Sequence, residues 1–312
     1  MTNADVLANL LTDVEREAAS RRCSPEATYR LQFHAGFTFQ DAAHLAPYFH
    51  DLGISHVYAS PYLKARPGST HGYDVLDHQH LNPEIGRDAD YAAYIDALRQ
   101  HNLGQILDVV PNHMGIVGNE NIWWNDVLEN GPSSPYANYF DIAWQASPRP
   151  ALRDRVLLPL LGEPYGQVLE AGEIGLRYEA GTFTAHYYEH RLPVAPCTWS
   201  KILSHDLDKL EPILGSESPP FHEYQSILTA VRNLPPRTET SAERIAERQR
   251  EKEVIKRRLA VLTDSCAEVR EHLAAVVARF NGTPGDPHSF DLLDDLLNDQ
   301  AYRLSSWRVA SD

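Results

Sequence analysis

Two short polar motifs, about 35 residues apart, carry the side chains of this chain that are best suited to chemistry. They are His71-Gly72-Tyr73-Asp74 and Asp108-Val109-Val110-Pro111-Asn112-His113. The ring of Tyr73, in a loop rich in Gly and His, could stack on the apolar face of a pyranose with little loss of side-chain entropy. Asn112 and His113 follow an apolar stretch, where they could hydrogen-bond sugar hydroxyl groups. The chemistry that these residue types favour is therefore sugar binding.

Each motif also has a purely structural interpretation. A carboxylate such as Asp108 in an apolar strand is costly unless it is paired, and a hydrogen-bonded strand end without any ligand would satisfy it. Tyr73, taken alone, is more often packed within its own loop. From these residues alone, both interpretations stay open.

Two groups of histidines raise the question of a metal ion. The first group holds His71, His78 and His80 with Asp74 and Asp77. Its spacing matches no standard zinc motif. The second group, His186 and His190, lies at the end of one expected strand, where residues four apart are about 13 Å apart. We expect no metal, and no cofactor, because no Gly-rich phosphate loop follows the expected strands.

The elements around the two motifs repeat in a regular order. Alternating or apolar segments predict strands at residues 27–33, 54–59 and 105–110. Helical spacing predicts two helices, one from about Thr38 to Leu52 and interrupted by Pro47, the other capped by Asp88 and ending near Gly104. A long polar loop, residues 60–86, follows the second strand. This order is typical of a parallel α/β sheet or barrel, in which ligands bind at the carboxyl ends of strands. Both motifs fall there.

The regular order is lost after Met114. Aromatic residues among Asn, Gly and Pro, and an expected hairpin around Ala180-Gly181, indicate a mixed subdomain. A helical region follows, with its clearest helix expected from Ser241 to Phe280 behind a capping box of Thr240 and Glu243. Its apolar seam includes Cys266, which we interpret as a core residue, and we interpret the charged run from Glu243 to Arg258 as its solvated face.

Composition limits the partners. The chain of 312 residues has 28 basic and 43 acidic residues, a net charge of −15. It lacks the basic footprint of a general nucleic-acid binder. Three distant cysteines favour a reducing compartment. The sequence shows neither a signal peptide nor a membrane span, so we expect a cytoplasmic protein without nucleic-acid or membrane partners.

Taken together, the motifs resemble glycoside hydrolase family 13, the α-amylase superfamily. Residues 108–113 look like its first short sequence region, at the end of the third barrel strand, and residues 72–74 look like its sugar-stacking tyrosine motif. Within the superfamily, the chain is similar to the maltooligosyltrehalose synthases in further segments, residues 27–32, 58–63, 68–74, 121–131 and 302–312.

The resemblance implies an α/β fold, the N-terminal part of a (β/α)8 TIM barrel with an inserted mixed subdomain and a helical insertion. The implied domains are an N-terminal helix and linker (residues 1–26), the first three βα units of the barrel (27–113) and the mixed subdomain (114–198). A helical subdomain (199–300) and a return towards the barrel (301–312) follow.

The resemblance also implies an activity and a substrate. The family converts the reducing-end α-1,4 bond of a maltooligosaccharide into an α,α-1,1 bond, which leaves a terminal trehalose unit. Carried over, Tyr73 would stack on the glucose beside the scissile bond, and His113 would hydrogen-bond its hydroxymethyl group. Asp108 would organise the base of the pocket and Asn112 would steady the turn. Asp74 completes the expected substrate-binding set.

The bond-breaking carboxylates are expected elsewhere. Retaining glycoside transfer needs a nucleophilic carboxylate and an acid roughly 5–5.5 Å apart. The family carries them on strands after a segment like residues 302–312, so we expect them beyond Asp312 and expect this chain to be inactive alone. We interpret the last acidic cluster as the solvated face of a helix, residues 290–300; it consists of Asp291, Asp294, Asp295 and Asp299. Two alternatives remain, an α-amylase-like hydrolase and a non-catalytic α-glucan-binding module.

Overall fold

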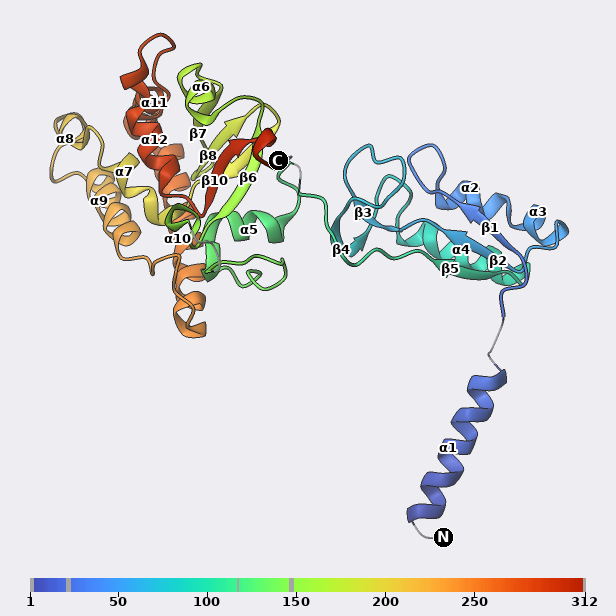
Figure 1. Cartoon of the computed structure of the whole chain (residues 1–312). Helices are drawn as coiled ribbons and strands as arrows, with labels where there is room; N and C mark the ends of the chain where they lie inside the picture. Colours follow the sequence, from blue (N-terminus) through green and yellow to red (C-terminus); the bar gives the residue numbers. More distant parts are fainter. Residues whose placement is uncertain (1–2, 21–23, 117, 146–148, 311–312) are drawn as a thin grey trace. The chain divides into compact units, whose positions relative to one another are not determined.

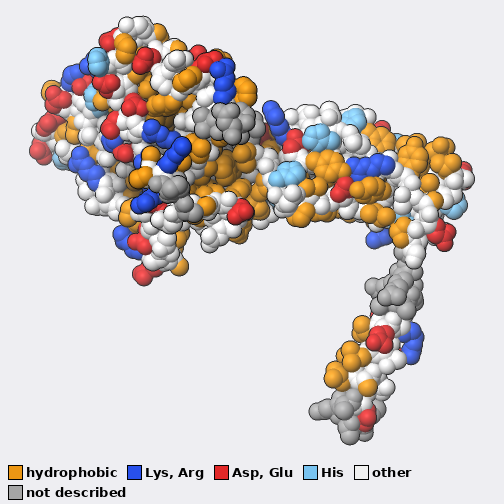
Figure 2. Space-filling model, viewed as in Figure 1, with side chains coloured by type: hydrophobic (Ala, Val, Ile, Leu, Met, Phe, Trp, Pro, Cys, Tyr) orange, Lys and Arg blue, Asp and Glu red, His pale blue; other side chains and the backbone are white. Residues whose placement is uncertain are grey.

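The computed structural model describes residues 3–20, 24–116, 118–145 and 149–310. The chain forms two compact units, Met1–Gly115 and Ile116–Asp312. Helix α1 (Asn3–Ser20) opens the first unit, and Figure 1 shows the order of the elements. Apolar side chains of α1 are exposed, as Figure 2 shows along this helix. Among the described residues, no helix is both long enough and apolar enough to cross a membrane.

A parallel sheet forms the centre of the first unit. Its strands, in the spatial order β1-β2-β5, are β1 (Thr28–Leu31), β2 (His56–Ala59) and β5 (Gly104–Leu107). The three expected strands are confirmed, although each is shorter than expected. Leu31 and Ala59 lie in register and are buried with residues of the helices. The mixed α/β character is therefore confirmed, whereas the described residues do not close this sheet into a barrel.

The helices of this unit begin where local hydrogen bonds can start them. Thr38 accepts a hydrogen bond from the backbone N–H of Asp41, whose carboxylate accepts one from the N–H of Thr38, which confirms the expected cap. The helix is divided at Leu45 into α2 (Phe39–His44) and α3 (Ala46–Asp51). Pro47 lies in the first turn of α3, where its missing N–H costs no helical hydrogen bond.

The expected cap of the next helix is wrong by one residue. Helix α4 (Asp88–Gln100) begins after Arg87, and the carboxylate of Asp90 accepts the N–H of Arg87. Asp88 is therefore the first helical residue. The acidic first turn still suits the positive end of the helix dipole.

The segment expected to be one long polar loop contains an antiparallel pair of strands. These are β3 (Leu63–Ala65) and β4 (Val75–Leu81), paired with register shifts. Ala65, Val75 and Leu76 are buried. The motif around Tyr73 thus lies between two strands that hold its ends.

The second unit combines two small sheets with helices. Strand β6 (Val156–Leu161) pairs in parallel with β10 (Tyr302–Ser306), and β7 (Ile174–Glu179), β8 (Thr182–Tyr187) and β9 (His190–Pro193) form an antiparallel sheet. The expected hairpin around Ala180-Gly181 is confirmed as β7 and β8. His186 and His190 lie on neighbouring strands and not, as expected, at the end of one strand.

Helices make up most of the rest of this unit. They are α5 (Ile122–Asn130), α6 (Tyr165–Glu170), α7 (Ser200–Leu203), α8 (Leu207–Leu214), α9 (Pro219–Arg232), α10 (Ala242–Ser265), α11 (Ala267–Phe280) and α12 (Asp291–Asn298). Short 3₁₀ turns cover Gly131–Ser133, Pro150–Leu152, Pro196–Thr198, Pro287–Phe290 and Trp307–Ala310.

The prediction of one helix from Ser241 to Phe280 is wrong. Cys266 has an extended backbone and separates α10 from α11. The cap is also different, because the Ser241 side chain accepts the N–H of Arg244. The apolar seam continues through the break, so the spacing of apolar residues does not mark it. The two helices pack on different elements, α10 on α9 and α11 on β7. Cys266 is buried, which confirms its place in the core.

The acidic helix near the end of the chain is only partly solvated. Leu293, Leu296 and Leu297 of α12 are buried, as its apolar side predicts. Asp295 and Asp299, however, each lie 2.6 Å from the ammonium group of Lys201. These two carboxylates therefore tie α12 to α7 as well as facing solvent.

Candidate functional site

Tyr73 and Asp108 meet at the carboxyl end of the parallel sheet. The Tyr73 hydroxyl donates a 2.5 Å hydrogen bond to Oδ2 of Asp108. Asp108 directly follows β5 and its backbone N–H extends the ladder to the carbonyl of Ala59 at 2.9 Å. Both motifs were expected at the carboxyl ends of the strands, and the structure places Tyr73 and Asp108 there.

Two residues that the sequence argument gave no role complete this cluster. Arg30 and Tyr58 are cross-strand partners on β1 and β2. Because side chains alternate along a strand, they share the face of the sheet opposite Leu31 and Ala59. Tyr58 donates a 2.9 Å hydrogen bond to Oδ2 of Asp108.

Arg30 holds the two tyrosines together. Its guanidinium donates a 2.6 Å hydrogen bond to the Tyr73 hydroxyl and lies 4.6 Å from the centre of the Tyr58 ring. A further guanidinium nitrogen is 3.7 Å from Oδ2 of Asp108. The signal that could have found Arg30 and Tyr58 is their place on the strands that precede the polar motifs, on the face opposite the buried Leu31 and Ala59.

This cluster sets the charge of its members. The Tyr73 and Tyr58 hydroxyls, followed by the nearby Arg30, hold the pKa of the Asp108 carboxyl below its usual range. The same hydrogen bonds to a carboxylate raise the pKa of both tyrosines. At neutral pH the cluster therefore consists of one carboxylate, one guanidinium and two neutral phenols.

The loop that carries Tyr73 is fixed by a glycine and by short hydrogen bonds. Gly72 has a φ of 79°, and a Cβ there would lie 2.8 Å from the carbonyl oxygen of Pro61. The Ser69 hydroxyl donates to Asp74 at 2.5 Å and accepts the N–H of Gly72 at 3.1 Å. Asp74 thus braces the loop, and these contacts do not join it to Asp108.

His113 and Asn112 are exposed beside the cluster. The Nε2 atom of His113 lies 3.1 Å from the backbone carbonyl oxygen of Tyr73, and its Nδ1 lies 3.3 Å from Oδ1 of Asn112. Since a carbonyl can only accept, Nε2 donates there. The structure therefore brings His113, Tyr73 and Asp108 together at one edge.

The arrangement can bind hydroxyl groups beside an aromatic ring. Within the described part of the chain, the hydrogen bonds to the Asp108 side chain all fall on Oδ2, which leaves Oδ1 as an acceptor. The Asp108 side chain is 23% exposed and that of Arg30 is 35% exposed, so both can be reached by a ligand. A charged acceptor, a charged donor and half-buried rings are the groups that sugar binding needs.

Comparison with known proteins defines the class first. Residues 42–158 match the catalytic domain of alpha amylase. The match begins in α2 and ends in β6, and so it includes Tyr73, Asp74, Asp108, Asn112 and His113. The chain therefore contains alpha-amylase-type sequence around the candidate site.

The more similar relatives are named for one activity. A Mycobacterium tuberculosis protein named for maltooligosyl trehalose synthase is 42% identical over 170 residues, which are 50% of this chain and 22% of that protein. A crystal structure of a maltooligosyl trehalose synthase is 27% identical, with a TM-score of 0.56, over 91% of this chain and 26% of the other. A maltooligosyltrehalose synthase variant from Arthrobacter ramosus is 28% identical, with a TM-score of 0.54, over 92% and 24%. The resemblance to this group is confirmed, and the chain spans about a quarter of the length of these relatives.

Proposed function

We propose that this chain supplies the glucose-binding floor of a maltooligosyltrehalose synthase-like enzyme. The observation that carries the proposal is the bond between Tyr73 and Asp108, inside the segment that matches alpha amylase. The whole protein would convert the reducing-end α-1,4 bond of a maltooligosaccharide into an α,α-1,1 bond. Its fold would be a (β/α)8 barrel, of which residues 27–113 are the first three βα units.

In this proposal each side chain has a separate task. The Tyr73 ring stacks on a glucose, and its hydroxyl keeps the ring in place through Asp108. Oδ1 of Asp108 accepts a hydrogen bond from a sugar hydroxyl, and the His113 ring hydrogen-bonds the hydroxymethyl group of the glucose. Asn112 steadies the turn beside His113, and Asp74 braces the Tyr73 loop. Arg30 positions Tyr73, and Tyr58 positions Asp108.

Binding and bond breaking are divided in this proposal. The resemblance assigns the nucleophilic Asp, the acid/base Glu and a second Asp to later strands of the barrel. We therefore propose that the 312-residue chain binds a maltooligosaccharide and does not rearrange it. Isomerisation also requires the released glucose to remain, turn and attack through its anomeric hydroxyl before water does, which an enclosed site favours.

One experiment tests the binding and the reaction together. Maltopentaose is titrated into the chain and into Tyr73→Ala, and the products are then assayed for loss of reducing ends. We expect binding by the chain, weaker binding by the variant and no turnover by either. Equal binding by the two proteins would refute the role of Tyr73, and turnover would refute the division of tasks.

The alpha-amylase match supports a second candidate, a hydrolase of the same superfamily. The two reactions differ in their products. Hydrolysis of maltopentaose creates new reducing ends, whereas isomerisation removes one and creates none. Assaying the full-length protein for reducing ends separates them. The expected cytoplasmic location stays a prediction.

A further inference from the structure

A second polar cleft lies within residues 116–312 and shares no residue with the Tyr73–Asp108 cluster. Its volume is about 620 Å³, and it is lined by parts of α5, β8, β9 and α10. Cavities of a few hundred to a thousand Å³ are typical of small-ligand sites. This cleft is therefore large enough for a short oligosaccharide.

One wall of the cleft is the polar face of a strand. Thr182, Thr184 and His186 of β8 line it, while the alternating residues Phe183 and Ala185 are buried in the core. The Thr184 hydroxyl and Nε2 of His186 lie 2.8 Å apart. Because side chains alternate along a strand, packing one face in the core presents this row of polar groups to the cleft.

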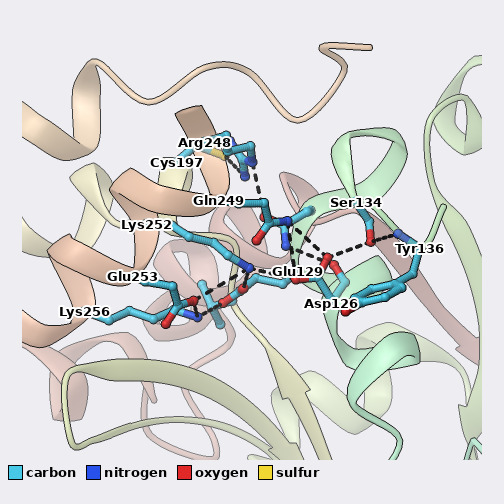
Figure 3. Close-up of polar contacts among 12 residues, drawn as sticks. Asp126, Glu129, Ser134, Tyr136, Cys197, Arg248, Gln249, Lys252, Glu253 and Lys256 are labelled. Atoms are coloured by element: carbon cyan, nitrogen blue, oxygen red, sulfur yellow. Dashed lines mark hydrogen bonds and ion pairs between the residues drawn. The ribbon is translucent and has the colours of Figure 1, made fainter. Parts of the chain in front are cut away.

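The floor of the cleft is a set of buried ion pairs between α5 and α10, which Figure 3 shows. The ammonium group of Lys252 lies 2.8 Å from Asp126 and 2.8 Å from Glu129, and Lys256 lies 2.6 Å from Glu129. The side chains of Lys252 and Glu129 are 4% and 7% exposed. Glu253 also lines the cleft, 3.8 Å from Lys252 and 3.3 Å from Lys256. Three carboxylates and two ammonium groups largely neutralise one another, so the floor has an excess of only one negative charge.

The rim adds both signs of charge and a small apolar surface. Glu179 and Arg191 are exposed on either side of β8, and Ile122 is 64% exposed. A phosphate would meet carboxylates here, and a metal ion would meet ammonium and guanidinium groups. A neutral ligand with many hydroxyls fits better, because each hydroxyl can donate to a carboxylate and accept from a cation.

We propose that this cleft is a second binding site for α-1,4-glucan. The choice of glucan rests on the proposed function, while the preference for a neutral polyhydroxyl ligand rests on the cleft. A second site would hold a distant part of a long chain and raise the effective concentration of its end at the first site.

Calorimetric titration of the full chain with maltoheptaose tests the proposal, with Tyr73→Ala used to weaken the first site. We expect that Tyr73→Ala retains one class of site. Adding Arg191→Ala should weaken that remaining binding about tenfold, the effect of one lost hydrogen bond to a charged group. Arg279→Ala is the matched control, because Arg279 is an exposed arginine of α11 that does not line the cleft.

The outcomes separate this proposal from the first. If Tyr73→Ala abolishes all binding, the second site is refuted and the first stands. The same follows if, in the Tyr73→Ala background, Arg191→Ala changes the maltoheptaose affinity no more than Arg279→Ala does. If Arg191→Ala removes all binding and Tyr73→Ala removes none, the cleft is the glucan site and the proposed role of Tyr73 fails. Displacement of maltoheptaose from the cleft by inorganic phosphate would show an anion site and refute the proposal.

Discussion

The hydroxyl of Tyr73 lies 2.5 Å from Oδ2 of Asp108, across 35 residues of sequence. This bond joins the loop between β3 and β4 to the end of β5. A half-buried phenol that donates to a carboxylate keeps its ring in one orientation, and a ring fixed before the ligand arrives loses less entropy on binding.

Two substitutions of Tyr73 separate the contribution of the ring to glucan binding from that of the hydroxyl group. Tyr73→Phe keeps the ring and loses the hydrogen bond to Asp108, so we expect maltopentaose binding to weaken by roughly 1 kcal/mol or less at this solvent-accessible position. Tyr73→Ala loses the ring as well and should bind far more weakly. Titration calorimetry of both variants checks this order, and equal losses would argue against stacking.

Arg30 should act through the two tyrosines. Arg30→Met removes the donor to Tyr73 and the cation over Tyr58, and we expect maltopentaose affinity to fall several-fold. Arg30→Lys should not restore affinity, because an ammonium group lacks the planar fork of donors.

The control for Arg30 is Arg99→Met. Arg99 is an exposed arginine on α4 with a carboxylate partner of its own, Asp96. It should leave affinity unchanged. Full rescue by Arg30→Lys would show that charge alone matters.

The Asp108 carboxylate should contribute to stability with a defined pH dependence. Its pKa in the folded chain is lowered, first by the Tyr73 and Tyr58 hydrogen bonds. The contribution is therefore present above the ordinary value of 3.8 and is lost as the pH falls through the lower, folded pKa. The difference in urea unfolding between the chain and Asp108→Asn should be largest well above pH 3.8 and should shrink as the pH falls below 3.8 through the lowered pKa. A constant difference would contradict this assignment.

Gly72 should not tolerate a side chain. Its φ of 79° is unfavourable for alanine, and the new Cβ would press on the carbonyl of Pro61. We expect Gly72→Ala to cost about 2–3 kcal/mol of stability and to weaken glucan binding. Gly68→Ala is the control, because Gly68 has a φ of 74° and open space around its Cβ position. Gly68→Ala should lose only the stability that the unfavourable backbone conformation costs, about 1 kcal/mol. If denaturant unfolding showed equal stability losses for the two variants, a clash with Pro61 would be ruled out.

Local signals predicted local structure well. Thr38 and Asp41 form the expected cap, and the alternation of β7 and β8 marked the hairpin. The break at Cys266 was not predictable, because the apolar spacing continues through it while the two helices on either side pack on different elements, α9 and β7. For the site, the sequence motifs pointed to Tyr73 and Asp108 but not to Arg30. The residues next to Arg30 in the sequence do not reveal its partners, because the register of the sheet brings those partners to it.

The ion pairs between α5 and α10 were not predictable either. Their lysines belong to the charged run from Glu243 to Arg258, which we interpret from the sequence as a solvated face. That interpretation is wrong for Arg248 and Lys252, which are buried. Burial alone would raise the pKa of Glu129 and lower that of Lys252. Their mutual attraction, with Lys256 and Asp126, outweighs burial and shifts each pKa in the opposite direction.

Lys252→Met should therefore leave two carboxylates poorly compensated and cost about 3–5 kcal/mol. Lys256→Met should cost less, since Lys256 is 18% exposed. The folded pKa of Glu129 is lowered and that of Lys252 is raised. The contribution of the pair is thus lost as the pH falls below the ordinary 4.5 of Glu129 and as it rises above the ordinary 10.5 of Lys252. In urea unfolding at pH 7, adding Glu129→Gln to Lys252→Met should recover part of the loss, because it removes an unpaired buried charge. Additive losses in this double-mutant cycle would mean that the two residues do not interact in solution.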